Sequence, residues 1–188
     1  VRARTMERME ADDLDIIARA MHSMDIDVYV SPDGNSLAMS ADGYFVDDDE
    51  PEDDWWRVPR AETAEEYDDM VAFTDSVGDR GAQARLRAAT TGSGAFRRFR
   101  QAVHNDPTEV GTEWGAFQDA RQELRALEWL GEEHLMDQDL HAALVAKRRA
   151  VIHGVEARLG GIRDREIQQV LDLERQLQRP ATRHDRRR

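Results

Sequence analysis

The chain has 188 residues, of which 40% are hydrophobic and 35% are charged, and its formal net charge is −13. A chain of this length is expected to form one domain. It has no cysteine, which excludes disulfides, thiolate catalysis and cysteine-based zinc sites. No stretch approaches the roughly 18 consecutive apolar residues of a membrane-spanning helix, and no basic-then-apolar leader is present. We therefore expect a cytoplasmic protein without membrane contact.

The charge is distributed unevenly along the chain. Residues 1–79 contain 6 arginines and 23 acidic residues, a net of −17, whereas residues 80–188 contain 20 basic and 16 acidic residues, a net of +4. A protein with such polarity can orient on a charged partner. The interpretation that we favour for the acidic half is a solvated surface.

The N-terminal part predicts one helix and a small sheet. Apolar residues recur at helical spacing over residues 10–23. Strands are expected at Ile26–Val30 and Ser36–Met39, joined by a turn at 31–35 that contains Pro32 and Gly34. Two further strands are expected at Tyr44–Val46 and Trp55–Val58. Between them, seven of the eight residues from Asp47 to Asp54 are acidic, which is typical of a loop.

The remainder predicts helices. Thr63 and Glu66 have the spacing of a capping box that opens a helix, and Asp79 can cap the next one. Gly92 and Gly94 separate that helix from a short one containing Phe96, Phe99 and Val103. Longer helices are expected over 112–134 and over 137–178, the second broken at Gly160–Gly161.

These elements predict an α+β fold, in which a small N-terminal antiparallel sheet packs on a mostly helical body and a long C-terminal helix or helix pair follows. We expect one domain over residues 1–135 and a helical arm with an arginine-rich tail over 136–188. Val145, Ile152 and Leu159 repeat every seven residues in that arm. This spacing suits packing on the body or on a second copy, so a homodimer through the arm is one expectation.

The segment from Trp56 to Leu135 resembles a bacterial family, the uncharacterised protein family 0158. The residues that carry the resemblance are Trp56-Arg57-Val58-Pro59, Glu66-Tyr67, Met70, Phe73, Gly94-Ala95-Phe96-Arg97-Arg98-Phe99, Trp114, Phe117, Asp119, Arg121 and Glu128-Trp129-Leu130. The resemblance implies a mixed, mostly helical fold and no known reaction. Ser93 departs from the pattern, which more often has a charged residue at that position.

Two charged residues fall beside the apolar stripe of the 112–134 helix, namely Arg121 and Glu128. A charge next to a core must be paired, or its burial costs several kcal/mol. We expect the two to pair with each other or with Arg97, Arg98 and Asp119, in an ion-pair network that holds the helices together. The alternative is a pocket where the start of the Ala95 helix binds an anion.

Two surfaces are candidates for binding a partner. The first is the acidic loop with its adjacent tryptophans, whose candidate residues are Asp48, Asp49, Asp53, Asp54, Trp55 and Trp56. Because strand side chains alternate, one tryptophan should point inward and the other outward. The second surface is arginine-rich and comprises Arg97, Arg98, Arg100 and the tail from Arg179 to Arg188. Arginines beside aromatic residues favour RNA contact, although Phe96 and Phe99 have the spacing of a buried face.

No residue pattern indicates a catalytic set, a metal site or a cofactor. Asp137, Asp139 and His141 lack any recognised ligand spacing. We therefore predict a non-catalytic interaction or regulatory module that binds a basic protein partner through its acidic face. The alternatives are an RNA- or ribosome-associated protein and, third, an enzyme that acts on an anionic small molecule near Gly94, Arg97, Arg121 and Glu128.

Overall fold

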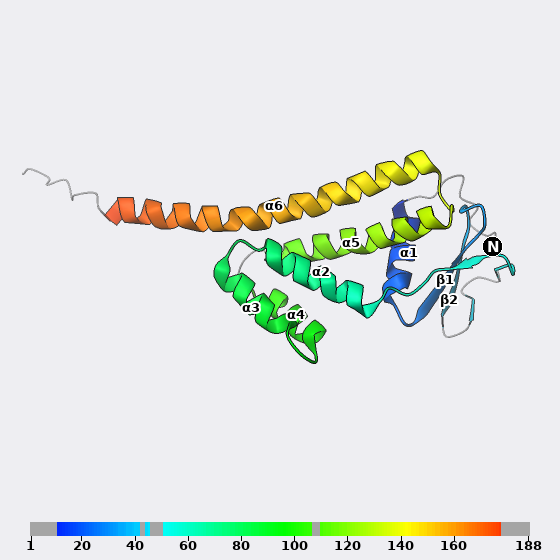
Figure 1. Cartoon of the computed structure of the whole chain (residues 1–188), viewed down its shortest axis with the longest axis horizontal. Helices are drawn as coiled ribbons and strands as arrows, with labels where there is room; N and C mark the ends of the chain where they lie inside the picture. The colour runs from blue at the N-terminus through cyan, green and yellow to red at the C-terminus, as the bar shows by residue number, and fades with distance from the viewer. Residues whose placement is uncertain (1–10, 42–43, 46–50, 107–109, 178–188) are drawn as a thin grey trace, which may run out of the picture.

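The computed structural model describes residues 11–41, 44–45, 51–106 and 110–177. It shows an α+β fold, in which the strands precede most of the helices and a long helix closes the chain (Figure 1). This confirms the predicted fold class. The elements are α1 (Ala11–His22), β1 (Ile26–Val30), β2 (Leu37–Ala41), β3 (Tyr44–Phe45), β4 (Trp56–Arg57), α2 (Thr63–Ser76), α3 (Arg80–Thr90), α4 (Ala95–His104), α5 (Val110–Glu132) and α6 (Gln138–Leu177).

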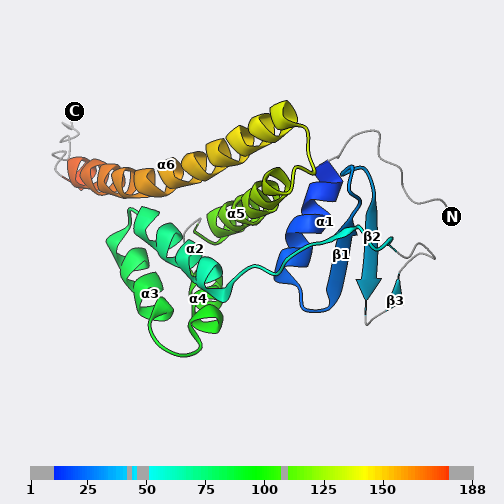
Figure 2. The same ribbon diagram turned by 45° about the vertical axis from the view of Figure 1, so that its right-hand side comes forward.

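The sheet is antiparallel throughout, with the strand order β3-β2-β1-β4. Its inner face presents Val28 and Val30, which are buried in one cluster with Leu14 and Ile17 of α1. Figure 2 shows α1 between the sheet and α5. The helix with apolar residues at helical spacing therefore packs its apolar stripe against the sheet, as amphipathic helices do.

The β1–β2 turn is built around Gly34, whose φ of 71° lies in the left-handed region. The Gly34 N–H donates to the Ser31 carbonyl at 2.8 Å, and the Ser31 hydroxyl donates to Asp33 Oδ1 at 2.6 Å. A Cβ at Gly34 would lie 1.9 Å from the Leu135 carbonyl oxygen. Glycine is thus required both by the turn and by its docking against the connection between α5 and α6.

The described part of the helical body has one core cluster with aromatic rings at its centre, to which the five helices α2 to α6 contribute. Phe73 of α2, Phe99 of α4 and Phe117 of α5 are all buried, and Trp114 makes edge-on contacts with Phe73 and Phe99 at centroid distances of 5.0 and 4.8 Å. The first half of α6 adds further apolar side chains to this core, Ile152, Val155 and Leu159. The residues with seven-residue spacing therefore pack on the body.

The predicted break at Gly160–Gly161 is wrong, because α6 is continuous over 40 residues. The α2–α3 turn approaches the backbone of α6 at this point. The Gly78 N–H donates to the Leu159 carbonyl at 3.1 Å, and a Cβ at Gly78 would lie 2.6 Å from the Gly160 carbonyl oxygen. This close approach requires glycine at position 78, whereas a Cβ at Gly160 or Gly161 would meet nothing within 4 Å. Packing of α6 on the body outweighs the low helix propensity of these two glycines.

The ends of several elements differ slightly from the predictions. The cap of α2 is Glu62, one residue before the expected Thr63, and the Glu62 N–H donates to the Glu65 carboxylate at 3.1 Å. Asp79 caps α3 as predicted, by accepting from the Ala82 N–H. Helix α5 begins at Val110 and ends at Glu132, two residues earlier than expected at each end. The helices therefore follow the predicted order with small shifts.

Candidate functional site

One edge of the sheet carries an exposed tryptophan beside exposed acids. Trp56 lies in the edge strand β4, opposite Val30, and is 42% exposed, whereas Trp55 is half-buried. Glu52, Asp53 and Asp54 precede it and are exposed. We call Glu52, Asp53, Asp54 and Trp56 the acidic edge. The predicted residues Asp48 and Asp49 lie outside the described residues.

Beside the acidic edge, two arginines share one carboxylate. Arg57 and Arg60 donate to Asp27 Oδ1 at 2.8 and 2.7 Å. The Asp27 carboxylate raises the pKa of Arg57 by hydrogen bonding and by charge attraction. By contrast, Glu52, Asp53 and Asp54 form no ion pair with any other described residue. Their charges therefore face solvent uncompensated.

The hairpin formed by α3 and α4 is positively charged, unlike the acidic edge. Residues 80–105 contain six arginines and no aspartate or glutamate. Arg98 meets no carboxylate of the described residues, contrary to the prediction. Its guanidinium donates to the carbonyls of Thr91 at 2.5 Å and Gly92 at 3.2 Å, and also to the Ser93 carbonyl. Arg98 thus closes the turn before α4, because a guanidinium can satisfy several carbonyl oxygens at once.

The other arginines of the hairpin divide into two groups. Arg85 and Arg87 pair with Asp106 and Asp75 at 2.6 and 2.7 Å, which ties the hairpin to its neighbours. Arg80, Arg97 and Arg100 are exposed and form no ion pair within the described part of the chain. These three guanidiniums are available to a partner.

The ion pair of Arg121 is not the one that the sequence predicts. Asp69, from α2, is buried and accepts from Arg121 at 2.6 Å and from Arg125 at 2.5 Å. The predicted partners Asp119 and Glu128 are both exposed. A buried carboxylate between two guanidiniums has its charge compensated. The network therefore joins α2 to α5 and involves no residue of α4.

The residues named for an anionic substrate are not brought into one site. Arg121 and Glu128 line one depression, to which neither Gly94 nor Arg97 contributes. The side chain of Arg121 is already committed to Asp69. The third predicted function therefore gains no geometric support.

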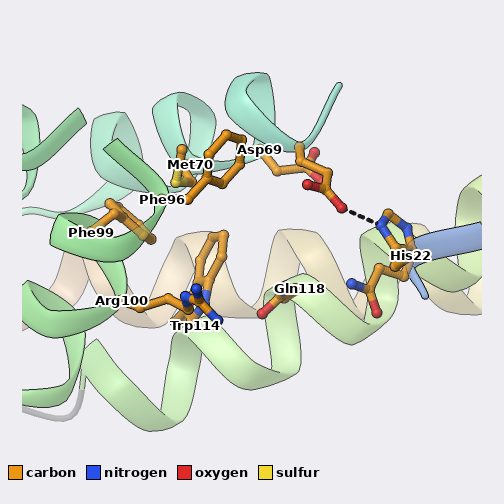
Figure 3. A pocket seen from close by; sticks show the side chains of 10 residues that line it. His22, Asp69, Met70, Phe96, Phe99, Arg100, Trp114 and Gln118 are labelled. Atoms are coloured by element: carbon orange, nitrogen blue, oxygen red, sulfur yellow. Dashed lines mark hydrogen bonds and ion pairs between the residues drawn. The ribbon is translucent and has the colours of Figure 1, made fainter. Parts of the chain in front are cut away.

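A pocket of about 340 Å³ lies between α2, α4 and α5 and reaches the end of α1. Figure 3 shows Phe96 and Arg100 entering it from α4, Trp114 and Gln118 from α5, and Asp69 and Met70 from α2. Phe96 and Arg100 are four residues apart, so both lie on one face of α4. One end of the pocket is aromatic and the other is polar.

A histidine and a glutamate form the polar end. His22, the last residue of α1, donates from Nδ1 to Glu66 Oε1 at 2.6 Å. The His22 side chain is only 9% exposed, and its Nε2 is buried without a hydrogen-bond partner among the described residues. The two residues are 44 positions apart in the chain, and no sequence signal joined them. Phe96 and Arg100, by contrast, were both singled out by the sequence.

Within the described ranges, no group of three or more histidines, aspartates or glutamates is placed to hold a metal ion. The helices of those ranges include none with the length and apolar character needed to cross a membrane.

Comparison of the chain with family models, with curated proteins and with solved structures finds no match. The resemblance to the uncharacterised protein family 0158 therefore stays a prediction, based on the residues that carry it between Trp56 and Leu135.

Proposed function

We propose that this chain is a non-catalytic interaction module that binds a basic segment of a partner protein through the acidic edge. The observation that carries the proposal is the exposure of Trp56 on an edge strand, two residues after three exposed carboxylates that have no partner among the described residues. This is the predicted acidic face, restricted to the part that the structure describes.

The chemistry of the acidic edge suits such a partner. A tryptophan supplies a large rigid apolar area and is enriched among the residues that dominate binding energy. The carboxylates of Glu52, Asp53 and Asp54 attract lysine and arginine side chains and accelerate encounter. Among the described strands, β4 pairs with β1 alone, and an edge strand offers unpaired backbone groups to an extended segment.

The test is recovery of partners from the native cell by the tagged full chain. A variant with Glu52→Gln, Asp53→Asn and Asp54→Asn should lose a basic partner that the unaltered chain recovers, and Trp56→Ser should lose the same one. The matched control removes three exposed charges from α5 by Asp119→Asn, Glu128→Gln and Glu132→Gln. Equal recovery by the edge variants and the control would reject the proposal.

RNA association through the α3–α4 hairpin is the second candidate function. The observation that favours it is the absence of any acid from residues 80–105, together with the exposure of Arg97 and Arg100. Guanidiniums on phosphates release counterions, so binding must weaken steeply with salt. Replacing Arg97 and Arg100 with alanine should reduce the slope of log affinity against log salt by about 1 for each arginine that binds a phosphate. A protein that retards no RNA at low salt would eliminate this candidate.

A further inference from the structure

The pocket between α2, α4 and α5 combines features that the acidic edge does not use. Its volume of about 340 Å³ is at the lower end of the roughly 300–1,000 Å³ that is typical of small-molecule sites. It therefore suits a ligand built around one ring system with a short substituent.

The aromatic end favours a flat ligand. Figure 3 shows Phe96 of α4 on one side of the pocket and Trp114 of α5 on the other. Trp114 is held by its edge-on contacts with the buried rings of Phe73 and Phe99. Phe96 packs only partly against the same core. Two aromatic rings on either side of a cavity stabilise a planar group through its faces.

The polar end requires hydrogen-bond donors on that ligand. Glu66 can only accept, and its Oε2 has no partner among the described residues. The Nε2 atom of His22 is buried without a hydrogen-bond partner in the described part of the chain, so an atom of the ligand can satisfy it. Such an unsatisfied group costs about 1–3 kcal/mol. His22 also fixes the position of the Glu66 carboxylate before any ligand binds.

The rim adds a positive charge. Arg100 lines the pocket, is exposed, and forms no ion pair in the described ranges. A guanidinium matches a phosphate through paired hydrogen bonds. The pocket thus presents, in order, a cation at the rim, aromatic walls, and acceptors at the far end.

We infer that this pocket binds a purine nucleotide, with the base between Phe96 and Trp114, the N–H edge of the base on Glu66, and the phosphate on Arg100. Guanine fits this polar end better than adenine, because guanine presents adjacent N1–H and N2–H donors to a carboxylate. Gln118 and Gln122 also line the pocket, and their amide groups form hydrogen bonds with the remaining edge atoms of the base. The nucleotide is either free or part of a single RNA strand, since both present the same chemistry.

Calorimetric titration of the full chain with guanosine monophosphate tests the inference. Binding should weaken about tenfold to a hundredfold in Phe96→Ala, the usual effect of removing one stacked ring. Arg100→Ala should weaken the binding of guanosine monophosphate but leave the binding of guanosine unchanged, because guanosine has no phosphate. The matched control is Arg149→Ala, because Arg149 is an exposed arginine of α6 that forms no ion pair in the described ranges and does not line the pocket. Glu66→Gln should reduce the preference for guanosine monophosphate over adenosine monophosphate.

A second set of titrations distinguishes a free nucleotide from a base in a single RNA strand. A guanine-containing single-stranded oligonucleotide that guanosine monophosphate displaces would place an RNA base in the pocket, whereas binding of the mononucleotide alone would indicate a free nucleotide. If Phe96→Ala melts at a lower temperature than the unaltered chain, Phe96→Leu replaces it in the titration, since leucine fills most of the space of the phenylalanine side chain without an aromatic ring. The inference is overturned if neither ligand binds, or if both Phe96 variants and Arg100→Ala bind as tightly as the unaltered chain.

Discussion

The carboxylate of Asp69 accepts a hydrogen bond from the Arg121 guanidinium at 2.6 Å, and this bond ties α2 to α5. The Asp69 side chain is only 5% exposed, and its second oxygen accepts from Arg125. A carboxylate so far from water is stable only because both of its oxygens meet a cation. The buried ion pairs of this helix interface therefore share one acid.

Replacing Asp69 with alanine should lower the free energy of unfolding by about 3–5 kcal/mol, because the change leaves Arg125 buried without its main partner. Urea denaturation followed by circular dichroism measures this loss. The neighbouring residue Asp68 is exposed, so Asp68→Ala should change the free energy by about 0.5 kcal/mol or less. Equal effects of the two substitutions would contradict the proposed importance of the network.

A second ion pair, between Arg148 of α6 and Glu123 of α5, is also largely shielded, with side chains 12% and 20% exposed. Burial lowers the pKa of Arg148. Glu123→Ala should cost about 2–3 kcal/mol of unfolding free energy, because the guanidinium loses its counter-charge. The double variant Glu123→Leu with Arg148→Met should recover most of that loss, as measured by urea denaturation. A double variant less stable than Glu123→Ala would show that the pair itself stabilises the helix contact.

The Asp33 carboxylate should make the β1–β2 turn sensitive to acid. Its hydrogen bonds, first from the Ser31 hydroxyl and then from Asn35, lower the pKa of Asp33 below its ordinary value of 3.8. A lowered pKa means that the folded state holds the charged form more firmly than the unfolded state. This contribution is therefore complete above pH 3.8 and is lost as the pH falls through the folded-state pKa.

The comparison of the unaltered chain with Asp33→Ala tests this expectation. The variant should be less stable well above pH 3.8, and the difference between the two chains should shrink as the pH falls below that value. Thermal melting across that range measures it. A difference that stays constant with pH would show that the carboxylate is not the group responsible.

Gly34 should tolerate no side chain. Gly34→Ala places a Cβ in a left-handed residue and within 1.9 Å of the Leu135 carbonyl, so backbone strain alone should cost about 1–3 kcal/mol. Gly115→Ala is the control, because nothing lies within 4 Å of its Cβ position in α5. That substitution should stabilise the protein by about 0.5–1 kcal/mol. Thermal melting of both variants shows whether their effects differ in sign.

The parts of the fold that depend on neighbouring residues could be predicted from the sequence. The turn at Asp33–Gly34 and the cap at Asp79 are encoded by side chains that bond their own backbone within a few positions. Strand β1 is also encoded locally, because its buried residues alternate along the strand. Local chemistry sets these features, and the structure has them where they were expected.

The contacts that join distant segments could not be predicted in the same way. Asp69 is one of several acids in the sequence of α2, and only the approach of α5 distinguishes it from its exposed neighbour Asp68. The pairing of His22 with Glu66 likewise depends on how α1 meets α2. Gly160–Gly161 indicated a break because the sequence does not show that the preceding residues Val155 and Leu159 pack on the body. Of the pocket, the sequence indicated Phe96 and Arg100 but not the partners opposite them.

The attachment of α6 has a mechanical consequence. Helix α6 packs on the body through Ile152, Val155 and Leu159, and its Leu159 carbonyl accepts a hydrogen bond from the Gly78 N–H. The helix then continues to Leu177. About 25 Å of α6 lies past Gly160, so a tilt of about 10° where the helix packs on the body would move its far end by about 4 Å. The helix is therefore a lever whose fulcrum is the α2–α3 turn, and small rearrangements of the body are magnified at its tip.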